Sequence, residues 1–367
     1  RDRKDHSFDT RMISQSLVLG LYLQNQKVRL DRDRIGTYAS SLNSDYKTQR
    51  RAVYGQWEPK LRDKVDLLFG ARYEHFEDDY NDTNGTKSQS SDDLYSIEAG
   101  INLTLNDSDL SILLSRASKS GGVNTDASSN ISTVDPIFQD ELVNRLRYNR
   151  ETLTNFEIRN KVSIYGGEFI TTVFYNHRKN PQFETFLYDH LTSFAFIGYQ
   201  DNASESNSFG LELDLSKRIN DRLLIRSTWS LIDTEIKNLR VYDFDEYGYI
   251  NIDSKDQPRA ASYQYHIAID FQATPTLSAQ LQLEGRDDYE YAYYFSHRSE
   301  NVNLLHASLE SVKDSITFTV WARNLLNEEY PIHGLYWGND PRDDYANNLY
   351  TQLGEPRNIG LSIRYDL

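Results

Sequence analysis

Few side chains in this sequence stand at spacings that suit catalysis or metal binding. The eight histidines are scattered, and none forms a His-x-x-x-His pair that would hold a metal. Neither a nucleophile elbow nor a phosphate-binding glycine loop is present. The acidic run EDDYND (77–82) could bind a cation such as calcium. It lacks the alternating ligand spacing of a calcium loop, so we expect a solvated acidic loop. Because the sequence shows none of these catalytic or metal-binding patterns, we also expect no enzyme activity and no cofactor.

Segments that mix aromatic and charged residues are better suited to ligand binding. They are YDFDEYGYI (242–250), DYEYAYYFSHR (288–298) and YPIHGLYWGNDPRDDY (330–345). Aromatic rings supply a large contact area at low entropic cost, and arginine adds charge-assisted hydrogen bonds to anionic chelates. We place a ligand contact at position 245, which is Asp245, in the middle of the first segment. In the third segment we consider Tyr336, Trp337, Arg342 and Tyr345; the other contacts stay undefined.

Composition limits the protein classes to consider. The chain has 367 residues, a net charge of −15 and a mean hydropathy of −0.68. Its 26 tyrosines argue against disorder, and its acidic balance argues against nucleic-acid binding. The absence of cysteine excludes a disulfide framework. No apolar run approaches the roughly 18 to 20 residues of a membrane helix, and the chain opens without methionine, so we expect residues upstream.

Alternation of apolar and polar residues is the dominant pattern, and it predicts β-strands along the whole chain. In YQYHIAIDF the apolar side holds Tyr263, Tyr265, Ile267, Ile269 and Phe271. The polar side holds Gln264, His266, Ala268 and Asp270. The same alternation recurs at 65–74, 97–105, 156–164, 209–215, 277–283 and 316–320. The polar faces are rich in charge, which suits a wet interior, and the apolar faces are regular, which suits contact with lipid.

The connections between these strands alternate in length. Short turns are predicted at 60–63, 106–108, 166–167, 220–221, 274–275 and 313–314. Long polar connections are predicted at 32–44, 80–92, 119–150, 180–204, 238–257, 292–301 and 327–355. Tight turns at one end and long loops at the other are typical of a membrane barrel. We therefore predict an all-β, antiparallel transmembrane barrel wall of about fourteen strands. A soluble propeller or solenoid is the alternative, but no repeat period is visible.

Five short motifs then resemble one family. TVWARNLLNEEYP (319–331) is similar to the penultimate-strand motif of TonB-dependent outer-membrane receptors. In chain order, the other matches are LLSRASKSGGVN (113–124), ETLTNFEIRNKV (151–162), NASESNSFGLELDLSKRINDRL (202–223) and GEPRNIGLSIRYDL (354–367). The last strand alternates up to Leu367, where the family usually ends in phenylalanine.

The resemblance implies an N-terminal plug inside a 22-stranded barrel. Residues 1–367 would form one domain, about the last fourteen strands, with the plug outside this sequence. Asn324 would release the chain from the wall into loop 327–355, because asparagine side chains bond to nearby backbone. The aromatic rings could also form a girdle at the membrane interface, an explanation that we favour for 288–295.

The implied function is import of a scarce ligand across the outer membrane of a Gram-negative bacterium, with TonB and outer-membrane lipid as partners. A ferric siderophore is the expected ligand, while haem, cobalamin and oligosaccharides stay open. Two alternatives remain from other classes. One is a self-contained fourteen-stranded passive channel, and the other is a soluble extracellular binding or hydrolytic β-protein.

Overall fold

Strands make up most of the computed structural model, which describes residues 1–34, 40–193 and 195–366. The strands are β1 (Asp2–Ile13), β2 (Leu17–Arg34), β3 (Ser40–Trp57), β4 (Lys60–Arg62), β5 (Val65–Asp82), β6 (Lys87–Thr104), β7 (Ser108–Lys119), β8 (Gly122–Val123), β9 (Arg147–Tyr148), β10 (Glu151–Ile164), β11 (Gly167–Lys179), β12 (Gln182–Asp189), β13 (Ala195–Asn202), β14 (Glu205–Asn220), β15 (Leu223–Asp243), β16 (Gly248–Lys255), β17 (Tyr263–Thr274), β18 (Leu277–Arg286), β19 (Val302–Lys313), β20 (Ile316–Arg323), β21 (Pro331–Gly338), β22 (Asn347–Leu353) and β23 (Asn358–Tyr365). The helices are α1 (Thr125–Asn130), α2 (Pro136–Asn144) and the 3₁₀ helix η1 (Pro341–Asp343).

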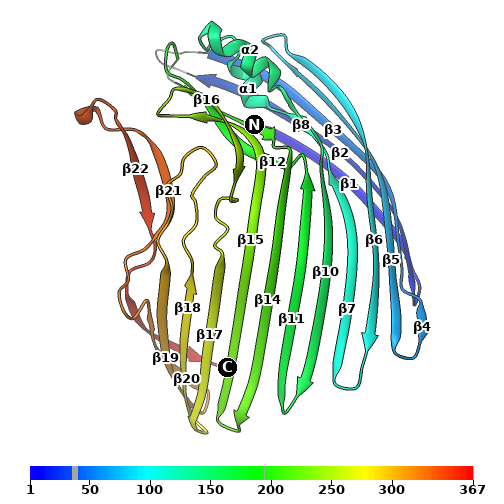
Figure 1. Cartoon of the computed structure of the whole chain (residues 1–367), viewed down its shortest axis with the longest axis vertical. Helices are drawn as coiled ribbons and strands as arrows, with labels where there is room; N and C mark the ends of the chain where they lie inside the picture. The colour runs from blue at the N-terminus through cyan, green and yellow to red at the C-terminus, as the bar shows by residue number, and fades with distance from the viewer. Residues whose placement is uncertain (35–39, 194, 367) are drawn as a thin grey trace.

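One curved sheet forms the body of the molecule (Figure 1). All its ladders are antiparallel, and each long strand pairs with its neighbours along the chain, from β1 through to β23. The short strands β4 and β16 pair with β5 and β15. This is the antiparallel wall that the alternating sequence predicts.

The sheet counts 17 strands, more than the fourteen predicted. Two of them are the short additions β4 and β16. A further one arises because residues 14–16 form an unpredicted turn between β1 and β2, where Ser14 N–H donates to the Leu17 carbonyl at 2.8 Å. The expected loop 80–92 is also absent, because β5 and β6 extend to Asp82 and Lys87.

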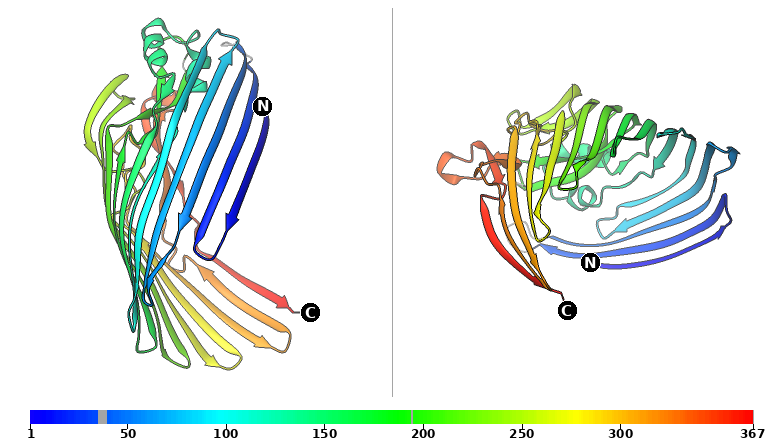
Figure 2. Two further views of the ribbon diagram at one scale, coloured as in Figure 1. Left: turned by 90° about the vertical axis from the view of Figure 1, so that its right-hand side faces the viewer. Right: turned by 90° about the horizontal axis from the view of Figure 1, so that it is seen from below.

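The two ends of the sheet stay apart. Figure 2 shows an open arch, with β1 and β23 as its free edges. Within the described residues no ladder joins β1 to β23, so the chain does not close on itself as a self-contained channel would. All the residues of β1 are exposed.

The apolar stripes of the strands face outward and are uncovered. Ile269, Phe271 and Leu281 are 37, 44 and 44% exposed, although each lies in the middle of a long antiparallel sheet. The polar residues of each strand lie on the concave side. On β5, for example, the carboxylates of Glu74 and Asp78 are buried there against arginines. This arrangement confirms the predicted faces, with a lipid-facing exterior and a charged interior.

Asn324 explains why the strand β20 stops where it does. Its backbone is left-handed, with φ of 45°, and its side chain is 2% exposed. The amide nitrogen donates to the carbonyls of Glu328 and Glu355 at 2.8 and 2.9 Å, and the amide oxygen accepts from the Glu328 N–H at 2.9 Å. Asn324 therefore ties the end of β20 to both ends of the last long loop, as its type predicts.

Helices play a small part in this fold. None of those in residues 1–34, 40–193 and 195–366 has the length and apolar character to cross a membrane. The terminal Leu367 and part of the predicted connection 32–44 lie outside the described residues.

Candidate functional site

The long connections gather at one end of the sheet and pack into a layer with its own core. This loop layer holds α1 and α2, the hairpin β12–β13, the end of β15 with β16, residues 287–301, and the hairpin β21–β22 (Figure 1). The opposite end of the sheet carries only tight turns, as the alternating connection lengths predict. Any ligand that approaches from the loop side meets this layer first.

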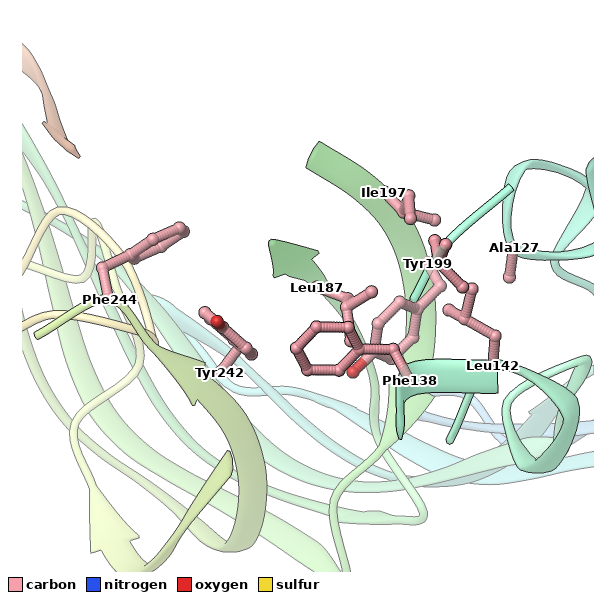
Figure 3. Packing of buried hydrophobic residues seen from close by; sticks show 9 residues of the cluster. Ala127, Phe138, Leu142, Leu187, Ile197, Tyr199, Tyr242 and Phe244 are labelled. Carbon is pink, nitrogen blue, oxygen red and sulfur yellow. The ribbon is translucent and has the colours of Figure 1, made fainter. Parts of the chain in front are cut away.

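The aromatic segment 242–250 contributes to the core of the loop layer (Figure 3). Tyr242 is fully buried and Phe244 is 5% exposed. They belong to a cluster that spans three long connections: Ala127, Val134, Phe138, Leu142, Leu187, Ile197, Tyr199, Tyr242 and Phe244. Tyr242 and Phe244 therefore belong to the hydrophobic core of the loop layer and are not exposed to a ligand. The turn of segment 242–250, with Asp245 and Tyr247, is exposed.

A charged network fixes the same three connections to one another. Arg145, at the end of α2, pairs with Glu141 and with Asp201 of β13, each at 3.1 Å. Arg240 of β15 binds the other oxygen of Glu141 at 2.9 Å. Burial raises the pKa of Asp201, while Arg145 opposes the shift. Because the charges are compensated in pairs, this part of the layer is held as one unit.

The segment 288–298 is not a membrane girdle. Tyr289, Tyr291 and Phe295 are 8, 2 and 7% exposed and form a cluster of their own inside the loop layer. A girdle at the membrane interface would expose its rings to lipid. The expectation for 288–295 is therefore wrong, because these rings close the layer above β18 and β19.

Three aromatic segments meet at Tyr336 on β21. Its hydroxyl donates to the Asp245 carboxylate at 3.0 Å, and its ring lies 4.6 Å from that of His297 and 5.7 Å from that of Phe295. Asn347 on β22 donates to the same carboxylate at 2.9 Å. The structure thus brings position 245, segment 288–298 and segment 330–345 together, and Asp245 ties the hairpin β21–β22 to the rest of the layer.

The other predicted residues of the hairpin lie away from this junction. Trp337 is half-buried, and its ring lies 5.6 Å from that of Tyr350, at a tilt of 38°. Arg342 is exposed and pairs with Asp340. Tyr345 is 58% exposed near the tip. Arg342 and Tyr345 are therefore accessible to a ligand, and the residues that contact Asp245 are Tyr336 and Asn347.

The acidic run 77–82 is not a loop. It lies within β5, where the fully buried Asp78 side chain pairs with Arg147 at 2.8 Å. Asp82 accepts hydrogen bonds from Tyr80 and Ser128 at 2.9 and 2.6 Å. Across the described part of the chain, no group of three or more histidine, aspartate or glutamate side chains could hold a metal ion.

One surface escaped the sequence analysis: a hollow on the concave face of β14, β15, β17, β18 and β19. The ladder register sets two rows of residues across these strands. The upper row is Glu212, Ser230, Gln264, Arg286 and Val302, and the lower row is Asp214, Thr228, His266, Glu284 and Leu304. Alternation predicts that each residue points inward, but only the register shows that they adjoin.

The link between Tyr336 and Asp245 can be tested directly. Burial, and then the hydrogen bond to Asp245, raise the pKa of Tyr336, so its phenol stays a donor throughout the neutral range. The stabilisation from this raised pKa is complete below the ordinary tyrosine pKa and is lost as pH rises through the folded one. We expect Tyr336→Phe to loosen the hairpin at neutral pH, and strongly alkaline pH to loosen the unsubstituted protein.

The measurement uses a nitroxide attached at Tyr345→Cys, which is a unique label because the chain has no cysteine. A mobile spectral component should grow by a few-fold in Tyr336→Phe. Tyr350→Phe is the matched control on the same hairpin, since it keeps the ring contact with Trp337. Equal mobility in the two variants would contradict the inference that the hydrogen bond from Tyr336 to Asp245 holds the hairpin in place.

Comparison with known proteins now bears on this geometry. The sequence profile of the family described as "TonB dependent receptor-like, beta-barrel" matches residues 2–353. No curated protein matches the sequence. Among solved structures, the ferric yersiniabactin uptake receptor FyuA from Yersinia pestis superposes with a TM-score of 0.71 at 18% identity, covering 100% of this chain and 54% of its own.

Two further structures show the same fold. The siderophore receptor PiuA from Acinetobacter baumannii has a TM-score of 0.70 at 15% identity, covering 99% of this chain and 56% of its own. The copper transporter OprC has a TM-score of 0.71 at 11% identity, with the same coverages. The chain spans about half the length of these structures.

The family profile, the outward apolar band and the one-sided loop layer agree with the five motifs. TonB-dependent receptor barrels are outer-membrane proteins that act as receptors and transporters rather than as enzymes. This chain belongs to the TonB-dependent receptor-like β-barrel family.

Proposed function

We propose that this chain forms part of the wall and mouth of a receptor in the outer membrane of a Gram-negative bacterium. The receptor binds a scarce ligand with its outer loops and imports it, driven by TonB. The observation that carries this proposal is that the two ends of the sheet differ. A packed layer of loops with exposed Asp245, Tyr247 and Tyr345 stands at one end of a lipid-facing wall, and tight turns stand at the other.

Ferric siderophores are the ligand class that we propose. FyuA and PiuA are a ferric yersiniabactin receptor and a siderophore receptor by name, and they share this fold at low identity. Haem, cobalamin, oligosaccharides and free metal ions are the competing ligands. OprC, a copper transporter by name, shares the fold equally well, so the fold alone does not choose among them.

The wall is proposed to be completed by partners outside this sequence. Residues 1–367 would act as one β-barrel domain, with further strands pairing at the free edges of β1 and β23 and a plug that contacts TonB. The passive-channel alternative requires β1 to pair with β23, a ladder that is absent from the described residues. Uptake of a panel of ferric chelates with and without TonB separates the two, because a passive channel would not respond to loss of TonB.

Deletion of the hairpin β21–β22 tests the position of the ligand site more directly. Deleting 332–350 and bridging the gap with Gly-Gly removes η1 and most of β21 and β22 but leaves every ladder of the wall intact. We expect ligand binding to fall by at least about tenfold, or roughly 1.4 kcal/mol. Heat-modifiable mobility on gels should show that the barrel still assembles.

A smaller deletion, of 340–345 alone, serves as the control for position. If it abolishes binding as fully as the large deletion, the contact lies at the exposed tip around Arg342 and Tyr345. If only the large deletion acts, the contact lies nearer Tyr336 and Asp245. Unchanged affinity in both variants would remove this hairpin from the ligand site.

A further inference from the structure

One lysine lies within the apolar outer face of the wall. On that face Lys217 of β14 pairs with Gly167 of β11 and with Ile225 of β15, and Leu215 precedes it by two residues. A charged side chain on a lipid-facing surface is costly unless its charged end reaches a polar region. Because lysine has a long apolar stem, it can lie along such a surface and still carry its ammonium group to the edge of the apolar band.

The ammonium group of Lys217 reaches the tight turn between β10 and β11. This turn stands at the end of the sheet opposite the loop layer (Figure 1). Nζ donates to the carbonyl of Tyr165 and lies 5.9 Å from the centre of the Tyr165 ring. Gly167 leaves room for the stem, because a Cβ there would lie 2.7 Å from Cδ of Lys217. The charge is therefore held at the boundary of the apolar band.

Tyr165 is unusual in two respects. Its backbone is left-handed, with φ of 50°, and Gly166 follows with φ of 68°. The first position of such a turn favours asparagine or glycine, because other side chains are strained there. The Tyr165 ring is also 91% exposed, the largest value among the large apolar and aromatic side chains that the structure describes. Apart from Lys217, no described residue forms a hydrogen bond or a ring pair with the phenol, so a partner outside the chain is expected to compensate.

The surroundings of the turn suit a lipid. Ile164 and Phe169, each 39% exposed, continue the lipid-facing band up to the turn. Tyrosine is favoured where hydrocarbon meets head groups, because its ring is apolar and its hydroxyl is polar. A phospholipid whose acyl chains lie along this band would therefore place its head group beside Tyr165.

The charge at the turn is complementary to a phosphate. Lys217 has three N–H donors, and the Tyr165 carbonyl takes one of them. Within the described part of the chain no carboxylate forms an ion pair with Lys217, neither Asp107 nor Asp221 of the flanking turns. Two donors and a full positive charge are thus available to the oxygens of a phosphate.

We propose that Tyr165 and Lys217 form a binding site for the head group of an anionic phospholipid. The phosphate accepts hydrogen bonds from Lys217, the ring of Tyr165 packs against the glycerol region, and the acyl chains cover Ile164 and Phe169. The site goes beyond the proposed function, because it depends on the lipid-facing wall and not on the imported ligand. It fixes the depth of this turn in the membrane.

Quenching of a fluorophore beside the site measures which lipid binds there. A bimane is attached at Ile225→Cys, the ladder partner of Lys217, in a chain that has no other cysteine. The receptor is placed in phosphatidylcholine vesicles that contain a little nitroxide-labelled phosphatidylglycerol or nitroxide-labelled phosphatidylcholine. The anionic lipid should be preferred by about fivefold. Equal quenching by the two lipids would overturn the proposal.

Salt and free phosphate distinguish a lipid from a dissolved anion. Sodium chloride should weaken the preference by screening. Inorganic phosphate at the same ionic strength should weaken it no further, because the apolar contacts to Ile164 and Phe169 are available only to a lipid. If inorganic phosphate abolishes the preference where chloride does not, the site binds a free anion and the assignment to a lipid is wrong.

Substitutions of Lys217 assign the preference to its charge. Lys217→Gln should remove it, and Lys217→Arg should preserve it. Lys313→Gln is the matched control, because Lys313 is an exposed lysine on the same outer face and at the same end of the sheet, paired with Ile316. If Lys217→Gln keeps the fivefold preference, or if Lys313→Gln loses it, Lys217 does not bind the lipid.

Tyr165→Asn tests the part of the ring by a different measurement. Asparagine suits the left-handed backbone, so the variant should unfold at a higher denaturant concentration than the unsubstituted protein in neutral detergent micelles. In vesicles of phosphatidylglycerol the gain should shrink or reverse, because the ring has lost its lipid contact. An equal gain in both media would show that Tyr165 has no lipid partner.

Discussion

Ile269→Arg should destabilise the folded wall by about 2–4 kcal/mol, because it places a charge at the lipid-facing centre of β17. Ile269 is 37% exposed on the outer face, between Ile225 and Leu281 on the adjacent strands. In lipid an arginine there has neither water nor a carboxylate within reach. The free energy of unfolding in lipid vesicles, from denaturant titration followed by tryptophan fluorescence, measures the cost.

Gln264→Arg is the control on the same strand. Gln264 is exposed on the concave side and adjoins Ser230 and Arg286 in the upper row, with Glu212 on the strand beyond. A new arginine can reach water and the wall carboxylates, so the change in stability should stay within about 0.5 kcal/mol. Equal costs at the two positions would mean that the outer face does not contact lipid.

Asn324→Ala is expected to cost about 3–5 kcal/mol, the largest effect outside the lipid-facing band. The substitution leaves the Glu328 N–H and two carbonyl groups without their partners at a site that is 2% exposed. It also forces alanine into a left-handed backbone with φ of 45°. The same unfolding measurement in vesicles gives the cost.

Two companion variants separate the causes. Asn324→Gly removes the hydrogen bonds but tolerates the left-handed backbone, so it should be less damaging than alanine by about 1 kcal/mol. Asn327→Ala is the matched control, because Asn327 is also left-handed, with φ of 61°, but is exposed and accepts one hydrogen bond, from the Arg357 N–H. If Asn327→Ala costs as much as Asn324→Ala, the buried hydrogen bonds do not explain the motif.

The wall could be predicted from sequence because lipid and water impose a period of two on each strand. The turn between β1 and β2 was missed because residues 14–16 read Ser-Gln-Ser, without glycine, proline or asparagine, and because the first half of β1 is polar on both faces. The run 77–82 looked like a loop because its residues are acidic. It is part of a strand because Arg147, far along the chain, compensates Asp78.

The candidate site was harder to predict, for a different reason. Tyr336 and Asp245 are 91 residues apart in the chain, and no local pattern pairs them. Aromatic residues serve equally as the core of a loop layer and as ligand contacts, so Tyr291 and Tyr345 look alike in sequence. Burial alone distinguishes them, with 2% of the first and 58% of the second exposed.

Pairing of each wall strand only with its neighbours in the chain has an evolutionary consequence. Every long loop begins and ends on adjacent strands, so a loop can be lengthened, shortened or replaced without altering the register of any ladder. Selection can therefore diversify the outer surface by recombination while the lipid-embedded frame stays constant. Grafting the 180–204 hairpin from one relative onto another is the laboratory equivalent. The ladders of the wall should keep their register after such a graft.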